Sequence, residues 1–202
     1  MGGTLGGDAA AEGAAMMVFL DVEASGFHGF PIEVAWCSAD LTAGRSWLIH
    51  PTDWPSHLEW DDAAERIHGL SFERLEAEGL PPEQVAEELA DDLMAASAVL
   101  SDNVPMDHGW LVELYCWAGK TRPVPFHLEE ADVVAVAARG HLAAAGLEPV
   151  ARGLAAEAGL VPHRALDDCI RQAITLCVAR GDEPDAIVWR ARRLLAEHGR
   201  DE

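Results

Sequence analysis

The chain has 202 residues, half of them hydrophobic, which suits one α/β domain with a substantial core but is cramped for two. Its 14 lysines and arginines against 35 aspartates and glutamates give a formal net charge of −21, which argues against a protein that holds long nucleic acid by neutralising phosphates. Any contact with nucleic acid should therefore be short and assisted by metal ions.

The cysteine pattern and the hydropathy of the sequence predict the compartment in which the protein works. Four cysteines stand singly in apolar surroundings without a Cys-x-x-Cys pair, as expected of buried free thiols: Cys37, Cys116, Cys169 and Cys177. No apolar run approaches the roughly 18 residues that a membrane span needs, and the N-terminus lacks the basic start of a secretory signal. We therefore expect a soluble, cytoplasmic protein without membrane contact.

Residues 1–15 are low in complexity and offer almost nothing to bury, so we expect a disordered tail ahead of a single domain over residues 16–202. Three β-type segments then follow closely, separated by glycine-containing turns: one that starts at Val18, then Ile32–Cys37 and Arg45–Ile49. This spacing predicts a hairpin meander.

The rest of the chain is mostly helical by pattern. In order, we predict irregular chain over Trp54–Leu80, a helix over Glu83–Ala96, a short strand at Val99-Leu100 and a helix over Asp107–Ala118. Around Asp132 the pattern leaves open either a last strand or the start of a helix that reaches Ala145. Three further helices follow, at Pro149–Gly159, His163–Ala179 and Asp185–Glu197. Strands first and strand-helix alternation afterwards suggest a mixed sheet with helices on both faces.

Asp21 and Glu23 stand two residues apart on the first predicted strand, so the period of a strand aims both carboxylates at one face. Two acids on one face repel each other, and a divalent cation would compensate them. An exposed strand end with two solvated acids is the alternative. This stretch alone does not decide between the two interpretations.

Two later segments carry further candidates. Asp107 lies where a predicted strand gives way to a helix, a common place for function in α/β proteins, although a helix N-cap is the better explanation of this residue taken by itself. His163 precedes Asp168 by five positions at the head of another predicted helix, where a capping pair is the alternative. Arg164 and Arg171 on the same helix either face a phosphate or pair with nearby acids.

Taken together and in this order, the three segments resemble the DEDDh-type 3′-to-5′ exonucleases, the DnaQ-like group of the ribonuclease H-like superfamily. The resemblance rests on Asp21-x-Glu23 with Ala24-Ser25-Gly26, on Asn103-x3-Asp107 with Leu111, and on His163-x4-Asp168, and it spans residues 17 to about 180. Ile67–Leu70 is also similar to the family's substrate-side loop. Two positions depart from the family pattern: Met106 replaces an aromatic residue, and Asp102 stands where His or Gly is more usual.

The resemblance implies a fold, a chemistry and a site. The fold is α/β and ribonuclease H-like, with a five-stranded mixed sheet, its second strand antiparallel, flanked by helices. The implied activity is metal-dependent 3′-to-5′ hydrolysis of short or single-stranded RNA or DNA, which releases nucleoside 5′-monophosphates. Two divalent ions, Mg²⁺ or Mn²⁺, would be bound by Asp21, Glu23, Asp107 and Asp168, with His163 as general base. The implied substrate contacts are Ala24, Ser25, Gly26, Phe27, His68, Leu70, Asn103 and Met106.

Two other functions remain open at this point. One is a catalytically weak nucleic-acid-binding or regulatory module on the exonuclease fold. The other is a different hydrolase with paired carboxylates, such as a glycosidase, which leaves His163 unexplained. Assembly into a homodimer is also left open.

Overall fold

The structure is a computed structural model that describes residues 16–52, 60–119, 124–132 and 144–199. Five strands form one sheet: β1 (Met17–Ala24), β2 (Pro31–Ser38), β3 (Gly44–Leu48), β4 (Ala98–Ser101) and β5 (Leu128–Glu130), in the order β3-β2-β1-β4-β5. β2 runs antiparallel to β1 and β3, whereas β4 runs parallel to β1 and β5. The predicted meander and the mixed sheet with an antiparallel second strand are therefore confirmed.

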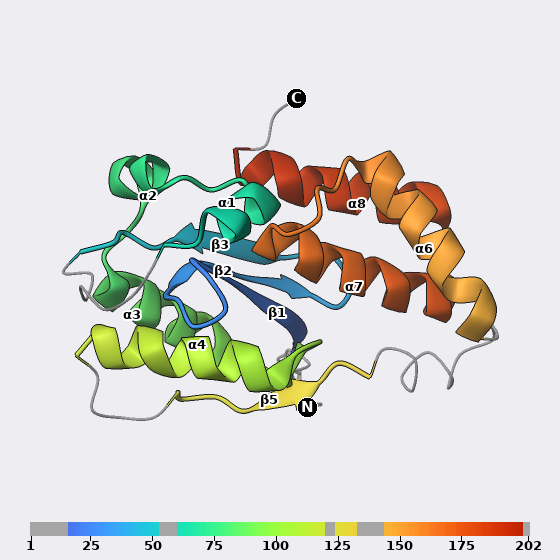
Figure 1. Cartoon of the computed structure of the whole chain (residues 1–202). Coiled ribbons are helices and arrows are strands. Elements are labelled where there is room, and N and C mark those ends of the chain that lie inside the picture. The colour runs from blue at the N-terminus through green and yellow to red at the C-terminus, as the bar shows by residue number, and fades with distance from the viewer. Residues whose placement is uncertain (1–15, 53–59, 120–123, 133–143, 200–202) are drawn as a thin grey trace, which may run out of the picture.

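Helices cover both faces of this sheet (Figure 1). The described helices are α1 (Asp62–His68), α2 (Phe72–Glu78), α3 (Pro82–Leu93), α4 (Val104–Trp117), α6 (Ala144–Ala158), α7 (Ala165–Arg180) and α8 (Pro184–Glu197). α3 and α4 lie on one face, and α7 lies against the other with α6 and α8 packed around it.

The alternation of side chains along β1 divides the interior into two apolar cores. Val18, Leu20 and Val22 point into the core that α3 and α4 close. Phe19 points the other way, into the core of α6, α7 and α8. By the same alternation Asp21 and Glu23 share the face of Phe19, which is the side of α7.

Two regions differ from the sequence-based expectation. The stretch predicted to be irregular contains α1 and α2, which begin at the N-caps Asp61 and Ser71. Each has seven residues, too short for an apolar stripe to repeat, so only its cap signals it. The last strand lies at Leu128–Glu130, just before the proposed Asp132, and most of the alternative helix that reaches Ala145 lies outside the described residues, as do Trp54 and the tail 1–15.

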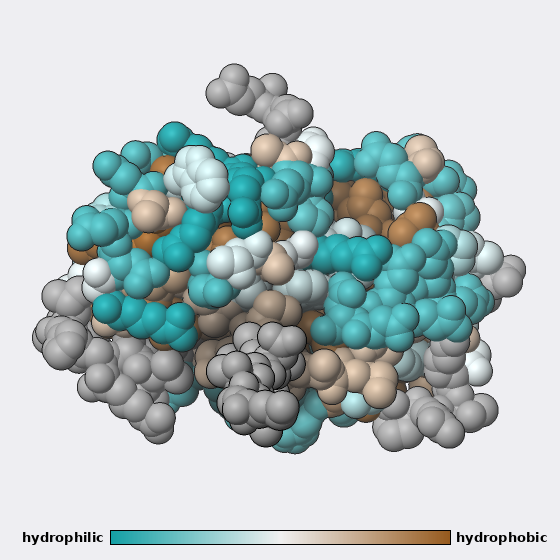
Figure 2. All heavy atoms as spheres, turned by 180° about the vertical axis from the view of Figure 1, so that it is seen from behind, coloured by the Kyte–Doolittle hydropathy of each residue, from teal (hydrophilic) through white to brown (hydrophobic). Residues whose placement is uncertain are grey.

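The surface of the protein reflects the many charged residues of its sequence. The face seen in Figure 2 is largely hydrophilic, with apolar side chains mainly in its hollows. Cys37, Cys169 and Cys177 are buried free thiols as predicted, but Cys116 is exposed because it lies on the solvent side of α4. Among the described helices none has the length and apolar character needed to cross a membrane.

Leu20→Ala should lower the free energy of unfolding by about 2–5 kcal/mol, because Leu20 is fully buried and the truncation leaves a cavity between the sheet and its helices. Denaturation in urea measures the change. The matched control is Val150→Ala on α6, where the side chain is 47% exposed, and it should change stability by less than about 0.5 kcal/mol. Equal effects of the two substitutions would contradict the assignment of β1 to the core.

Candidate metal centre

The centre is built where β1 extends beyond β4. The parallel pairing of these strands stops at Phe19 and Leu100, so beyond that point no strand among the described residues pairs with β1 on this side. The backbone of Val22 instead hydrogen-bonds to the carboxylate of Asp107. Asp21 and Glu23, both half-buried, flank Val22 on the other face of the strand pleat.

Asp107 reaches this place from the first turn of α4, where it is only 2% exposed. The hydroxyl of Ser101, the last residue of β4, donates to Asp107 Oδ2 at 2.5 Å. The same hydroxyl accepts a hydrogen bond from the Asn103 backbone N–H at 3.0 Å. The Ser101 hydroxyl therefore links the carboxylate of Asp107 to the end of β4 and to the β4–α4 turn. The alternative of a simple N-cap does not apply, because the N-cap residue is Asn103.

The third segment lies at the start of α7. His163 is exposed and has a left-handed backbone with φ of +60°, which is uncommon for a residue with a side chain. Its backbone N–H donates to Asp168 Oδ2 at 3.2 Å, although the N-cap residue of α7 is Arg164. Asp168 also forms an ion pair with Arg171 one turn further along α7.

These segments bring potential metal ligands together in two triads. Glu23, His163 and Asp168 form the first, and Asp21, Asp102 and Asp107 form the second. Within each triad the ligand atoms lie within 4.8 Å of one another. Asp21 and Glu23 stand two residues apart on β1, so the two triads, which between them contain all five predicted catalytic residues, are neighbours.

The pKa values show that negative charge in the centre is not fully compensated by protein groups. Burial, followed by the charges of Asp107 and Glu23, raises the pKa of Asp21 well above its ordinary value. Burial and the charge of Glu33 raise the pKa of Glu23 to about 7. Burial likewise raises the pKa of Asp107 to about 7, against the hydrogen bond from Ser101, which lowers it. A bound cation would relieve this repulsion.

Three residues close to the site are not among the predicted ligands or substrate contacts. Asp102 was noted only as a departure from the family pattern, but its carboxylate belongs to the second triad. Glu33 of β2 lies directly opposite Glu23 across the β1–β2 pair. Arg164 donates two hydrogen bonds to Glu33, so the ion-pair alternative for Arg164 is correct. A charged residue inside the predicted strand Ile32–Cys37 was the available signal for Glu33, because a charge on a buried strand requires a partner.

The predicted substrate contacts differ widely in exposure. Phe27 and Asn103 are exposed, Gly26 and Met106 are half-buried, and Ala24, Ser25, His68 and Leu70 are buried. The buried hydroxyl of Ser25 accepts from the Phe30 backbone N–H at 2.9 Å, and His68 Nδ1 accepts from the Leu70 backbone N–H at 3.0 Å. Both side chains thus stabilise their own loops in this structure, and their contact with substrate stays a prediction.

The loop after β1 presents Phe27 to solvent. Its two ends are joined by the hydrogen bonds between Ser25 and Phe30, and a side chain at Gly29 would collide with the Ser25 hydroxyl. Phe27 is consequently 69% exposed. It lines a groove of about 580 Å³ together with Trp60, Asp61 and Arg66 of the neighbouring segment.

No protein-family model matches the chain, and no curated protein matches its sequence significantly. Solved structures do match its architecture. E. coli Exonuclease I, in complex with a dA16 oligonucleotide, gives a TM-score of 0.60 at 15% identity over 87% of this chain and 43% of that one. Exonuclease I from Methylocaldum szegediense gives 0.57 at 14% identity over 87% and 42%. Exonuclease X, in complex with 5′ overhanging duplex DNA, gives 0.51 at 16% identity over 87% and 99%.

This chain has the same fold as these exonucleases. The predicted ribonuclease H-like class is thereby confirmed. The chain spans less than half the length of the Exonuclease I structures and matches nearly the whole of Exonuclease X. At these identities the likeness concerns the exonuclease fold alone, so the chemistry of the centre has to be argued from its own residues.

Without metal, the protein should become less stable as the pH rises from about 4 to above 7. Glu23 and Asp107 hold their protons more tightly in the folded chain than in the unfolded one, so their contribution is present below the unfolded pKa and is lost as the pH passes about 7. The loss is on the order of a few kcal/mol. Denaturation in urea with chelator present, at pH values across this range, measures it.

Asp107→Asn should flatten this pH profile, because the amide cannot take up the charge. Glu113→Gln, at an exposed position of the same helix, is the matched control and should keep the wild-type profile. Mn²⁺ should raise Tm more at pH 8 than at pH 5.5, since the ligands must lose their protons to bind it. Identical profiles for wild type and Asp107→Asn would refute the electrostatic account.

Proposed function

We propose that this protein is a metal-dependent 3′-to-5′ exonuclease that hydrolyses short or single-stranded RNA or DNA and releases nucleoside 5′-monophosphates. The observation that carries the proposal is the pair of triads at the end of β1, in which the ligand atoms of each triad lie within 4.8 Å of one another. Burial and the charges of neighbouring acids together raise the pKa values of Asp21 and Glu23 there. The exonuclease fold supports the same conclusion independently.

The donor set of the centre fits two hard divalent cations. The first triad offers two carboxylates beside the His163 imidazole, which is kept for the general base, and the second offers three carboxylates. Oxygen-rich sets of this kind suit Mg²⁺ or Mn²⁺ rather than a thiolate-bound metal. Bound there, the two ions would lower the pKa of the attacking water and stabilise the charge on the leaving 3′ oxygen.

The residues of the chain then have separate tasks. His163, exposed beside Glu23 and Asp168, accepts a proton from the attacking water. The water oxygen bonds to phosphorus, and the bond from phosphorus to the 3′ oxygen of the preceding nucleotide breaks. That oxygen takes up a proton and becomes the new 3′ end. The Ser101 hydroxyl and the Val22 backbone hold Asp107 in place during these changes.

Exposed groups around the centre support a nucleic-acid substrate. The ring of Phe27 offers a face on which a base of any sequence can stack. Arg66 lines the groove beside it and can approach a phosphate. Two of the matching structures contain bound DNA, single-stranded in Exonuclease I and a 5′ overhanging duplex in Exonuclease X.

A labelled oligonucleotide tests the proposal. The protein is incubated with a single-stranded oligonucleotide labelled at either end, with Mn²⁺ and, separately, with chelator. Release of labelled mononucleotide from the 3′ end first, with a stepwise ladder from the 5′-labelled strand, supports an exonuclease. Binding without shortening selects the alternative of a catalytically weak nucleic-acid-binding module. Activity that survives chelation refutes the metal centre.

Replacement of the centre's residues should separate their roles. Asp21→Asn should abolish turnover, because it removes a charged ligand shared by the centre. His163→Ala should lower kcat by roughly 10²-fold or more, the usual contribution of a general base, while Mn²⁺ binding measured by electron paramagnetic resonance persists. His127→Ala, at an exposed position before β5, is the control and should leave kcat unchanged. Near wild-type turnover of Asp21→Asn would exclude the assigned site.

Substrate length should matter because the protein carries a charge of −21. Each added phosphate without a nearby cation meets long-range repulsion, which salt screens beyond about 8 Å at physiological ionic strength. We expect kcat/KM to be higher for a dinucleotide than for a long single strand at low salt, with a smaller difference at moderate salt. A long strand that is preferred at both salt concentrations would show that the charge lies away from the substrate path.

A further inference from the structure

The buried carboxylate of Glu33 connects the sheet to the start of α7. Glu33 is 2% exposed, and its two oxygens accept four hydrogen bonds. Arg164 donates from Nε to Oε2 and from Nη2 to Oε1, both at 2.9 Å. Ser46 Oγ donates to Oε1 at 2.9 Å, and the Ala165 backbone N–H donates to Oε2 at 3.2 Å. This carboxylate is therefore fully paired.

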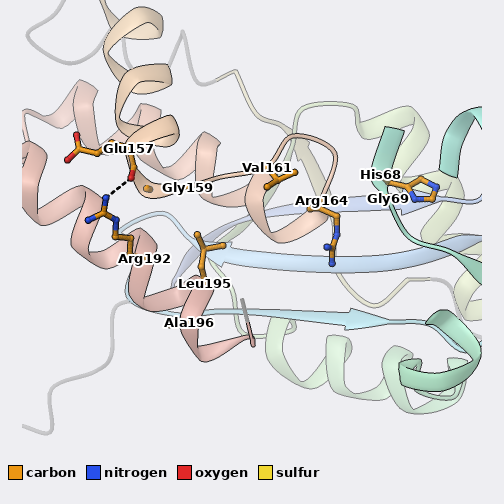
Figure 3. Close-up of a pocket in the computed structure, with 10 residues that line it drawn as sticks. His68, Gly69, Glu157, Gly159, Val161, Arg164, Arg192, Leu195 and Ala196 are labelled. Carbon is orange, nitrogen blue, oxygen red and sulfur yellow. Dashed lines mark hydrogen bonds between the residues drawn. The ribbon is translucent and has the colours of Figure 1, made fainter. Parts of the chain in front are cut away.

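The partner of Glu33, Arg164, lies next to the candidate centre in the chain. Arg164 is the N-cap residue of α7, directly after His163 and one helical turn before Asp168. In Figure 3 its side chain runs from the loop at the start of α7 toward the sheet, and His68 and Val161 line the same cavity, of about 1150 Å³. A planar guanidinium that binds one carboxylate through two bonds allows little rotation of either group.

The Glu33–Arg164 pair is connected to both segments that supply the first triad, β1 and the start of α7. Glu33 lies opposite Glu23 in the register of β1 and β2, so it is fixed to the strand that carries one ligand. Arg164 is bonded in sequence to His163, whose φ of +60° has to be maintained by its surroundings. The side chain of Asp168 in turn accepts from the His163 backbone.

We propose that Glu33 and Arg164 are positioning residues, which hold the imidazole of His163 and the carboxylate of Asp168 at the correct place relative to Glu23. The inference rests on the proposed exonuclease function. It assigns to the pair a task beyond stability, because a displacement of about 1 Å at a reacting group can lower a rate about 10²-fold.

The competing explanation is that this buried ion pair only stabilises the fold. Removal of one partner cannot distinguish the two, since an unpaired buried charge is itself strongly destabilising. Removal of both charges can, because a buried ion pair replaced by neutral groups of similar volume often leaves stability unchanged. The double variant Glu33→Gln with Arg164→Met is therefore the informative one.

The double variant should regain the Tm that each single variant loses, yet its kcat should stay about 10- to 100-fold below wild type with KM within about threefold. Amide hydrogen exchange should be faster than in wild type at His163 and Ala165. The matched control is Arg45→Met with Glu88→Gln, which removes a partly exposed ion pair between β3 and α3 and should change neither kcat nor these amides.

Wild-type kcat together with wild-type exchange in the double variant would overturn the positioning role. If the wild-type protein shows no chelator-sensitive nuclease activity, the proposed function fails instead, and the exchange rates of the two amides decide whether the pair orders this segment. If the double variant does not fold, Arg164→Lys replaces it, because lysine keeps the charge but not the planar pair of donors. A lower kcat at unchanged Tm supports the role in that variant, and an unchanged kcat overturns it.

Discussion

Carboxylates crowded at the end of β1 repel one another, and much of the local structure serves to hold them there. Glu33 is neutralised by the two hydrogen bonds of Arg164. Asp107 is held by Ser101 and by the backbone of Val22. Burial and then the charges of neighbouring acids raise the pKa values of Asp21 and Glu23, and Arg164 and Arg171 offset only part of this rise at Glu23. A centre with this balance is poised to take up cations, which is the physical basis of the proposed chemistry.

The exonuclease fold supplies the geometry that makes such crowding achievable. β1 extends past β4, and its end carries two acids, Asp21 and Glu23, on the face toward α7. The backbone of Val22 lies beyond the paired part of β1 and hydrogen-bonds to a third acid, Asp107. The sheet between two apolar cores keeps this strand rigid. Matching structures at 14 to 16% identity share the architecture and not the sequence, so the proposed function has to be argued from the few residues gathered at this strand end.

Several features were predictable because they depend on local pattern. The side-chain period of a strand placed Asp21 and Glu23 on one face, and the turn spacing predicted the β1–β2–β3 meander. Other features were not. α1 and α2 are too short to show a period, and β5 has three residues whose pairing with β4 comes from another part of the chain. Asp102 was recognised as unusual, but its place beside Asp21 depends on how the β4–α4 turn folds.

The sequence by itself determined the class of fold, the order of its main elements and the residue types from which a metal centre can be built, because these follow from hydrophobic period and from short motifs. Only the tertiary structure decided which acids share a space, which are neutralised, and that Glu33 of β2 is paired to Arg164 at the start of α7. The pair of Glu33 and Arg164 joins residues 131 positions apart in the chain. Local pattern carries no information about such distances, since they are set by packing of α7 against the sheet.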